Sequence, residues 1–398
     1  MSLTTPLTRN VRDDRRPTDM AAYEANGGYQ GLRAALAQSP EDCLQVLKDS
    51  NLRGRGGAGF PTGMKWSFVP MGDKCSPGHK YLICNADEME PGTFKDRLLL
   101  ECDPHQLIEG MIVSAYTLQA DVAYIFIRAE YHQATRLLQE AIAACHEKGY
   151  LGQDILGTGY QLEMHVHSSA GRYICGEETA LISSLEGKRA NPRAKPPFPQ
   201  VSGLWGRPTI VNNVETLCNV HHIIERGAEW FKSLGLTEDA GTKLYGVSGR
   251  VKNPGCWELP MGTPVRQIIE EYAGGMEDGY NLKGFLPGGG STESFTVPSV
   301  CFQTGAEITG EVEIYVNGSG PVNIIIDLPG GNQISTGNLD PGLLNTINNS
   351  VPASFLGLDS DPSGDWNITI QNNGGDNMTY SVVQSTLTIS SYTTTTVT

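Results

Sequence analysis

The sequence has no C-x-x-C pair, no apolar run long enough to cross a membrane and no basic residue after Lys283. Its nine cysteines are scattered, and no two lie closer than nine residues. This spacing argues against a local zinc ribbon or ferredoxin-type cluster motif. The polar segment Met1–Arg16 also lacks an apolar signal core. We therefore expect a cytoplasmic chain without direct membrane insertion, whose thiols are buried.

The charge is negative and unevenly spread. The 398 residues carry a net charge of −15, which argues against nucleic acid as the main partner. From Thr296 to the end there are nine acidic residues and no basic one, in a segment rich in Thr, Ser, Asn and Gly. Such a break predicts a domain boundary, and it is compatible with two different ancestries.

Before this break, strand-like and helix-like patterns alternate. We expect strands at Lys80–Asn85, Val122–Arg128 and Tyr160–His167, and helices at Pro104–Leu118 and His132–Lys148. This order implies an α/β fold with a mostly parallel, Rossmann-like sheet covered by helices. Ligands of such sheets bind outside the carboxyl ends of the strands.

After residue 240 the pattern changes twice. A small β-grasp module is expected at 241–293, with strands Lys243–Val251, Cys256–Leu259 and Leu282–Leu286 and a helix at Pro264–Ala273. From 294 to 398, alternating runs that include Val312–Val316, Val322–Ile326, Trp366–Ile370 and Leu387–Ile389 predict an antiparallel β-sandwich with a disordered tail. The α/β domain would then occupy 1–240.

A glycine cluster stands out within the α/β domain. Gly54, Gly56, Gly57 and Gly59 let the backbone turn its N–H groups toward a ligand, as in a phosphate cradle. Three cations that flank the cluster favour an anion site over a flexible surface loop, namely Arg53, Arg55 and Lys65. The helical spacing before the cluster and Pro61 after it argue against a standard dinucleotide turn.

Four further patches carry polar groups. Cys84–Gly92 follows a predicted strand and places an amide and acids at the edge of the sheet, although a solvated acidic turn is the alternative. Gly171–Thr179 leads into a helix with two adjacent glutamates, which are equally explained as partners of the helix dipole. Lys188–Pro199 is a basic proline loop that suits an anionic nucleotide or simply faces solvent. Thr209–Thr216 contains two asparagines, either of which could be an N-cap.

Together these motifs resemble the NADH- and FMN-binding subunit of bacterial respiratory complex I, the 51-kDa or F type, over residues 1 to about 293. The matching motifs occur in the family's order: Arg12–Asp14, the glycine cluster, Asn85–Glu88, Gly176–Leu181, the proline loop, Val211–Thr216 and Gly249–Val251.

The resemblance implies an NADH-oxidising flavoprotein in which NADH gives a hydride to FMN and no side chain acts as acid or base. It implies FMN contacts from Gly54, Arg55, Gly56, Lys65, Asn85, Asp87, Tyr173, Gly176, Glu177, Val211, Asn212, Asn213 and Thr216. It implies an NADH side lined by Gly57, Phe60, Phe68, Glu88, Glu90, Glu178, Lys195 and Phe198. It also implies partners in the peripheral arm of complex I, especially the 24-kDa-type [2Fe–2S] subunit, and a location peripheral to the inner membrane.

The resemblance stops near Phe295. The family continues into a helical bundle whose cysteines hold a [4Fe–4S] cluster, and those ligands are missing here, so we expect no metal site and a lost electron exit. Ser363–Ile370 weakly resembles a strand of secreted β-sandwich modules. A natural fusion, a misassembled reading frame and an engineered chimera all remain open. Two other functions stay open: the flavin subunit of a soluble hydrogenase or formate dehydrogenase, and a non-catalytic β-sandwich protein with an inactive flavin module.

Overall fold

The computed structural model describes residues 3–72, 78–282 and 285, together with the backbone of six strands between residues 307 and 393. The chain divides into two compact units. The first holds the helices and strands between Met20 and Tyr272, and the second holds the strands between Glu307 and Thr393.

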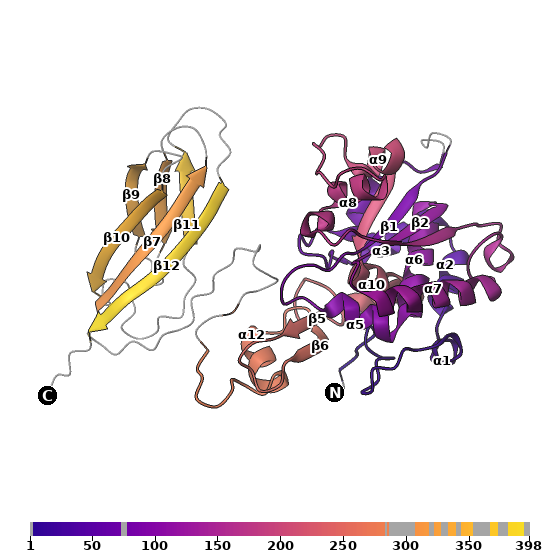
Figure 1. Ribbon diagram of the computed structural model, residues 1–398, viewed down its shortest axis with the longest axis horizontal. Coiled ribbons are helices and arrows are strands. Elements are labelled where there is room, and N and C mark those ends of the chain that lie inside the picture. The colour runs from indigo at the N-terminus through magenta and orange to yellow at the C-terminus, as the bar shows by residue number, and fades with distance from the viewer. Residues whose placement is uncertain are drawn as a thin grey trace. The chain divides into compact units, whose positions relative to one another are not determined.

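A four-stranded parallel sheet forms the centre of the first unit (Figure 1). Its strands lie in the order β3-β2-β1-β4, and every neighbouring pair is parallel. Their bounds are β1 Tyr81–Ala86, β2 Val122–Ile127, β3 Glu163–Ser168 and β4 Thr209–Asn213. The predicted α/β fold class is confirmed. Because the strands are parallel, their carboxyl ends meet at one edge of the sheet.

Helices cover both faces of this sheet. Side chains alternate between the faces of a strand, so Leu82 and Cys84 of β1 join the main core while Tyr81 and Ile83 join a smaller cluster. The helices are α1 Met20–Ala25, α2 Gln30–Leu36, α3 Pro40–Asp49, α4 Thr62–Ser67, α5 Lys95–Cys102, α6 Pro104–Leu118, α7 His132–Glu147, α8 Glu178–Leu185, α9 Pro199–Ser202, α10 Val214–Arg226 and α11 Ala228–Lys232. Short 3₁₀ turns lie at Ile155–Gly157, Tyr173–Gly176 and Leu204–Gly206.

Helix α6 is the buried centre of the main core. It begins where Asp103 accepts a hydrogen bond from the Gln106 N–H, and Pro104 occupies its first turn. A Cβ at Gly110 would lie 2.2 Å from the carbonyl oxygen of Leu217, so α6 and α10 pack closer than a side chain would allow. This contact fixes α10, which follows β4 directly.

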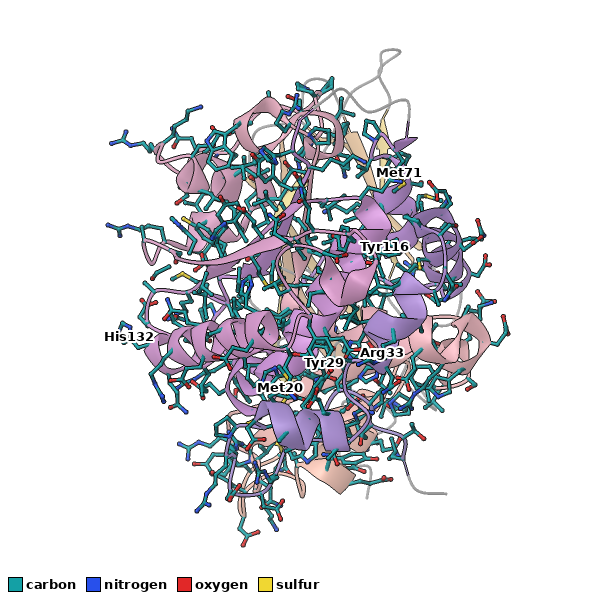
Figure 2. The ribbon with its side chains drawn as sticks, turned by 90° about the vertical axis from the view of Figure 1, so that its right-hand side faces the viewer. Met20, Tyr29, Arg33, Met71, Tyr116 and His132 are labelled. Atoms are coloured by element: carbon teal, nitrogen blue, oxygen red, sulfur yellow. The ribbon has the colours of Figure 1, made fainter. Side chains whose placement is uncertain are left out.

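Two buried carboxyl groups attach the N-terminal segments to α6. Asn10 donates to Asp103 Oδ2 at 2.8 Å, and burial raises the pKa of Asp103 to about 7 despite that bond. Glu109 accepts hydrogen bonds from the Tyr23 hydroxyl at 2.6 Å and the Tyr29 N–H at 2.8 Å. Tyr29, labelled in Figure 2, is fully buried and stacks on Tyr150 with ring centroids 4.1 Å apart.

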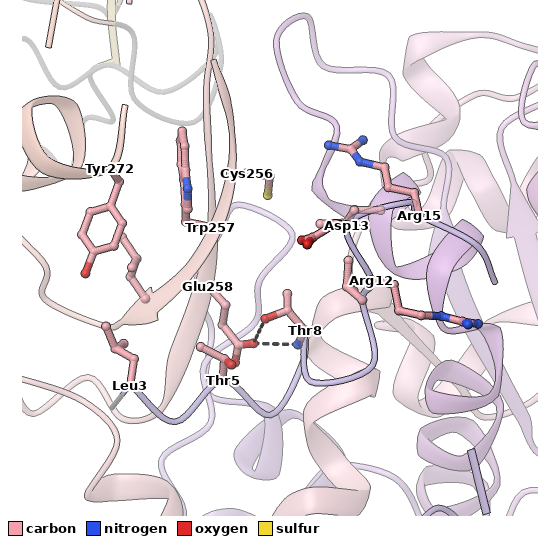
Figure 3. Close-up of a pocket in the computed structure, with 13 residues that line it drawn as sticks. Leu3, Thr5, Thr8, Arg12, Asp13, Arg15, Cys256, Trp257, Glu258 and Tyr272 are labelled. Atoms are coloured by element: carbon pink, nitrogen blue, oxygen red, sulfur yellow. Dashed lines mark hydrogen bonds between the residues drawn. The ribbon is translucent and has the colours of Figure 1, made fainter. Parts of the chain in front are cut away.

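A two-stranded antiparallel sheet follows α11. It pairs β5 Thr242–Val247 with β6 Gly255–Pro260, and a short helix Val265–Gln267 (α12) continues as a π-helix Ile268–Tyr272 (η5). Glu258 of β6 accepts hydrogen bonds from the N–H and hydroxyl of Thr8, at 2.7 and 2.9 Å, which joins the N-terminal segment to this sheet (Figure 3). A hollow of about 490 Å³ beside Glu258 is lined by residues that include Asp13, Trp257 and Tyr272.

Several predicted elements differ in extent. The strand expected from Tyr160 begins at Glu163, because Leu162 pairs with Gly152 in an isolated bridge. The strand expected to reach Val251 ends at Val247, because the chain bends at Gly249 and Arg250. The helix expected at Pro264–Ala273 is an α-turn followed by a π-helix. The strand expected at Leu282–Leu286 falls largely outside the described residues.

The second unit contains two three-stranded antiparallel sheets, with orders β10-β7-β12 and β11-β8-β9. The strands are β7 Glu307–Asn317, β8 Val322–Asp327, β9 Gln333–Leu339, β10 Leu344–Pro352, β11 Asn367–Asn372 and β12 Ser381–Thr393. The alternating runs indicated β7, β8, β11 and β12, whereas β9 and β10 carry too many polar residues to show the pattern.

The described cysteines take no part in disulfides. They are Cys43, Cys84, Cys102, Cys145, Cys175, Cys218 and Cys256, and all except Cys256 are buried. Within the described part of the chain, no helix is long and apolar enough to cross a membrane.

Candidate functional site

Polar side chains gather where β1 and β4 end. These strands are neighbours, with Asn85 opposite Asn213 in the parallel register. The Asn85 amide donates to the Gly176 carbonyl at 2.9 Å, which brings the third sequence patch to the same edge. The parallel sheet therefore collects three of the predicted motifs in one place.

The glycine loop closes onto this edge. The Thr62 N–H donates to the Leu52 carbonyl and the Gly54 N–H to the Phe60 carbonyl, at 2.8 and 3.0 Å. A Cβ at Gly56 would lie 3.0 Å from Asn213 Cβ, so a larger residue would have to push the loop and β4 slightly apart. Helix α3 precedes the loop and α4 follows it, so the loop is not a strand-to-helix dinucleotide turn, as predicted.

The two arginines of the loop do not present their charges to its tip. The Arg55 side chain is buried, 4% exposed, and its guanidinium donates to the carbonyls of Ala240 and Thr242 at 2.9 and 3.0 Å. Its backbone N–H donates to Thr216 Oγ1 at 2.8 Å. Arg53 forms an ion pair with Asp239 at 2.7 Å. The expectation that the Arg55 guanidinium neutralises an anion at the loop therefore finds no support in this geometry.

Lys65 on α4 is placed differently. Its ammonium donates to Glu178 Oε2 at 2.9 Å and to the Val211 carbonyl at 2.8 Å. Lys195 Nζ lies 2.6 Å from Glu178 Oε1 and 3.6 Å from Glu177 Oε1. Burial alone would raise the pKa of Glu178, but Lys65 and Lys195 outweigh it and lower the pKa. The carboxylate of Glu178 thus lies between the two cations Lys65 and Lys195.

Two acids expected at the ligand also cap helices. Glu177 accepts hydrogen bonds from the Thr179 and Ala180 N–H groups at the start of α8. Glu88 accepts from the Asp96 and Arg97 N–H groups at the start of α5, at 3.0 and 3.1 Å, and from the Tyr131 hydroxyl. Both carboxylates therefore have structural partners before any ligand is considered.

Asp87 has an unused acceptor. Ser169 donates to its Oδ1 at 2.8 Å, whereas Oδ2 is buried and has no hydrogen-bond partner among the described residues. Burial raises the pKa of Asp87, and this effect is larger than the lowering caused by the Ser169 hydrogen bond and the charge of Arg128. A buried acceptor without a donor is costly, and a ligand hydroxyl or ring N–H would satisfy it.

The two asparagines of the fifth patch have distinct partners. Asn212 Oδ1 accepts from the Trp66 indole N–H at 2.8 Å. Asn213 is the N-cap of α10, since its Oδ1 accepts from the Glu215 N–H at 3.0 Å. Of the two alternatives left open by the sequence, Asn213 is the cap.

Aromatic rings remain exposed on the predicted nucleotide side. Phe60, Phe68 and Phe198 are 48%, 55% and 53% exposed. Tyr173 is also exposed, and its hydroxyl donates to Glu90. Exposed aromatic faces can stack on a planar ring.

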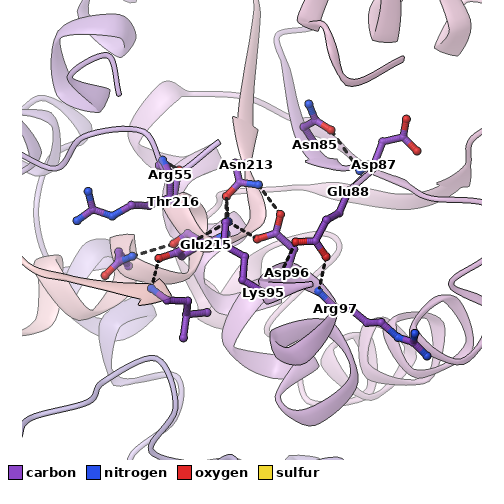
Figure 4. Close-up of polar contacts among 12 residues, drawn as sticks. Arg55, Asn85, Asp87, Glu88, Lys95, Asp96, Arg97, Asn213, Glu215 and Thr216 are labelled. Atoms are coloured by element: carbon purple, nitrogen blue, oxygen red, sulfur yellow. Dashed lines mark hydrogen bonds and ion pairs between the residues drawn. The ribbon is translucent and has the colours of Figure 1, made fainter. Parts of the chain in front are cut away.

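A buried charge network beside the site was missed by sequence reasoning. Lys95 and Asp96 of α5 meet Glu215 of α10, and all three contact Asn213 or its neighbours (Figure 4). Glu215 is fully buried in the first turn of α10, which is a signal that a buried cation must accompany it. No sequence pattern near Lys95 or Glu215 identifies Lys95 as that cation. In the described ranges, no cluster of His, Cys, Asp or Glu is placed to hold a metal ion.

The fold and the site define a parallel α/β protein that gathers a glycine loop, an unused buried acceptor and two lysines paired with Glu178 at one side of its sheet. Residues 47–222 match the family model of the Nuo51 FMN-binding domain, and residues 244–295 match that of the SLBB domain.

Several curated relatives are F subunits of NADH-quinone oxidoreductase. Those of Salmonella typhimurium and Escherichia coli are each 57% identical over 294 residues, covering 74% of this chain and 66% of the relative. That of Aquifex aeolicus is 52% identical over 293 residues, covering 73% and 68%. The chain belongs to the family of NADH-quinone oxidoreductase F subunits, and it spans about two thirds of the length of these relatives.

Solved structures agree in fold. The NAD⁺-reducing [NiFe]-hydrogenase in its H₂-reduced state aligns with a TM-score of 0.55 and 38% identity, over 69% of this chain and 44% of that chain. Its air-oxidised state aligns with a TM-score of 0.56 and 32% identity, over 84% and 51%. The resemblance inferred from the motifs is thereby confirmed.

Proposed function

We propose that this chain is an NADH-oxidising flavoprotein module that holds FMN at the carboxyl edge of its parallel sheet. The observation that carries the proposal is the unpartnered buried oxygen of Asp87, directly after the end of β1, whose neighbour β4 packs against Gly56 of the glycine loop. When bound, FMN would supply the hydride acceptor for NADH. The side chains bind, orient and exclude water, and none has to move a proton.

The proposed FMN contacts are Gly54, Arg55, Gly56, Lys65, Asn85, Asp87, Tyr173, Gly176, Glu177, Val211, Asn212, Asn213 and Thr216. Lys65 uses two of its three N–H groups within the protein and keeps one for a phosphate oxygen. Arg55 contributes by fixing the loop, because its guanidinium donates to Ala240 and Thr242 and its backbone N–H to Thr216. Asp87 accepts from a hydroxyl or ring N–H of the ligand.

The proposed NADH side comprises Gly57, Phe60, Phe68, Glu88, Glu90, Glu178, Lys195 and Phe198. The three exposed phenyl rings offer faces for the adenine. Glu178 lies between Lys65 and Lys195 and offsets their charge. An anionic dinucleotide therefore meets a moderated positive field, which favours release of the product.

We propose the domain limits 1–240, 241–293 and 294–398, and a location peripheral to the inner membrane through complex I. The proposed partners are other peripheral-arm subunits, especially the 24-kDa-type [2Fe–2S] subunit, with quinone as the final acceptor and the [4Fe–4S] cluster of the family absent.

The hydrogenase structures favour a second candidate, the flavin subunit of an NAD⁺-reducing hydrogenase. The 57% identity to the F subunit of NADH-quinone oxidoreductase, against 38% to the hydrogenase, favours the first.

Titration of the purified chain with FMN and with riboflavin, followed by flavin fluorescence, tests this function. We expect saturable quenching by the chain and binding of FMN at least about tenfold tighter than riboflavin, because only FMN carries the phosphate. NADH added to the loaded chain should then bleach the flavin absorbance. Absence of FMN binding would refute the proposal and favour a non-catalytic β-sandwich protein.

A further inference from the structure

The ammonium of Lys95 is enclosed at the start of α5. Its Nζ lies 2.7 Å from Asp96 Oδ1, 2.8 Å from Glu215 Oε2 and 3.1 Å from Asn213 Oδ1 (Figure 4). The Lys95 side chain is 12% exposed, and those of Asp96 and Glu215 are 4% and 0% exposed. Lys95 donates hydrogen bonds to Asp96 and Asn213 and forms an ion pair with Glu215, so its ammonium is surrounded by protein acceptors.

This arrangement determines the orientation of the Asn213 amide. Its Oδ1 accepts from both Lys95 and the Glu215 N–H, and its Nδ2 donates to Asp96 Oδ2 at 2.6 Å. A flipped amide would direct its N–H groups at two donors, so the flipped state is disfavoured. One N–H of Asn213 is left beyond these bonds, on the side chain that packs against Gly56 of the glycine loop.

The same ammonium balances buried negative charge. Asp96 and Glu215 carry carboxyl groups, and Glu88 lies close enough to raise the pKa of Lys95 as well. Burial would lower the pKa of Lys95, but Asp96, Glu215 and Glu88 raise it above its usual value, so the amine stays charged. Glu215 also accepts from the Leu244 N–H at 2.8 Å, which attaches the network to β5.

We propose that Lys95 is a positioning residue of the flavin site. It holds the Asn213 amide so that one N–H of the amide is directed to FMN. Its positive charge also keeps the net charge behind that amide from becoming strongly negative. The proposal rests on the FMN site proposed above. It adds a residue outside the set of FMN contacts, acting through Asn213.

A double-mutant cycle tests the proposal in the full chain. The variants are Lys95→Met, Asn213→Ala and the two combined, and FMN affinity is measured by fluorescence quenching. We expect Lys95→Met to weaken FMN binding on the order of tenfold, and the combined variant to bind no more weakly than Asn213→Ala alone. The matched control is Lys232→Met, which removes a lysine paired with exposed Glu229 on the surface of α11.

A second readout separates positioning from simple loss of structure. Removing a positive charge behind the site should shift the midpoint potential of the bound flavin to more negative values, because the reduced form carries more negative charge. Unchanged FMN affinity in Lys95→Met, strictly additive losses in the cycle, or an unchanged midpoint potential would each overturn the proposal. If the unaltered chain binds no FMN, the proposed function fails instead.

A charge-compensated variant shows whether weaker FMN binding results from misfolding of the chain. Lys95→Met combined with Glu215→Gln removes one positive and one negative charge together and keeps an acceptor for the Leu244 N–H. Circular dichroism should show this variant folded, and it should bind FMN more weakly than Glu215→Gln alone. Equal FMN affinity of those two chains would contradict the role of Lys95.

Discussion

Lys65 Nζ and Glu178 Oε2 lie 2.9 Å apart, and this pair joins helix α4, after the glycine loop, to helix α8, after the third sequence patch. The side chains are 19% and 22% exposed, so solvent screens the pair less than a surface salt bridge. One residue of the pair belongs to the proposed phosphate contacts and the other to the proposed nucleotide side. We therefore expect a substitution of Lys65 to weaken the binding of FMN, and a substitution of Glu178 to tighten the binding of NAD⁺.

Lys65→Ala should weaken FMN binding by about tenfold or more. A charge-assisted hydrogen bond contributes roughly 1.5–3 kcal/mol, and the variant loses the cation placed for the phosphate. Fluorescence titration measures the change. The control is Lys48→Ala, which alters an exposed lysine on α3. Equal affinities of Lys65→Ala and the unaltered chain would contradict the assignment.

Glu178→Gln should tighten the binding of NAD⁺ while FMN content stays similar. Loss of the carboxylate leaves the charges of Lys65 and Lys195 available to an anionic dinucleotide. We expect a gain of about 1 kcal/mol, or roughly fivefold in Kd, by calorimetry on the FMN-loaded chain. Glu140→Gln, in an exposed pair with Arg136 on α7, should leave the affinity unchanged. A weaker nucleotide complex in Glu178→Gln would show that the role is wrong.

The sheet and the polar edge where its strands end could be predicted because they depend on local patterns. Buried apolar runs followed by polar residues identify β1 and its carboxyl end, and glycine density identifies the loop. The orientation of Arg55 could not be predicted, since its guanidinium binds the carbonyl of Ala240, 185 residues away along the chain. Only the folded arrangement decides which flanking cation is buried and which stays near the sheet edge.

The Lys95 network escaped prediction for the same reason. An adjacent Lys and Asp are typical of a solvated surface, and here the fold places both against Glu215 of a distant helix. In the C-terminal part, polar strands such as β10 Leu344–Pro352 show little apolar alternation, so backbone pairing alone reveals them.

Asp103→Asn should become more stable, relative to the unaltered chain, as pH rises. Burial raises the pKa of Asp103 from 3.8 to about 7, so the folded chain binds this proton more tightly than the unfolded chain. The stability contributed by the protonated group is fully present below the unfolded pKa and is lost as pH rises through the folded pKa. Asparagine keeps a capping side chain but cannot ionise.

Urea unfolding at pH 5.5 and pH 8 measures this effect. The difference in free energy of unfolding between Asp103→Asn and the unaltered chain should grow by about 2 kcal/mol across that range. Asp49→Asn, at an exposed position at the end of α3, provides the control and should show no such growth. A difference that does not change with pH would show that Asp103 titrates near its usual value.

The FMN-loaded chain should pass electrons from NADH to ferricyanide and should carry no [4Fe–4S] signal. Hydride transfer requires FMN and NADH held face to face, and the residues proposed for both lie on this chain. A [4Fe–4S] cluster requires four cysteine thiolates in one place. The nine cysteines are widely spaced, and the seven that the structure describes form no metal-binding group with their neighbours. Ferricyanide reduction is followed by absorbance, with the FMN-free chain as the control, and iron and sulfide are assayed chemically. Stoichiometric iron and sulfide would contradict the predicted loss of the cluster, and inactivity of a chain that demonstrably binds FMN would contradict its proposed role as an NADH-oxidising module.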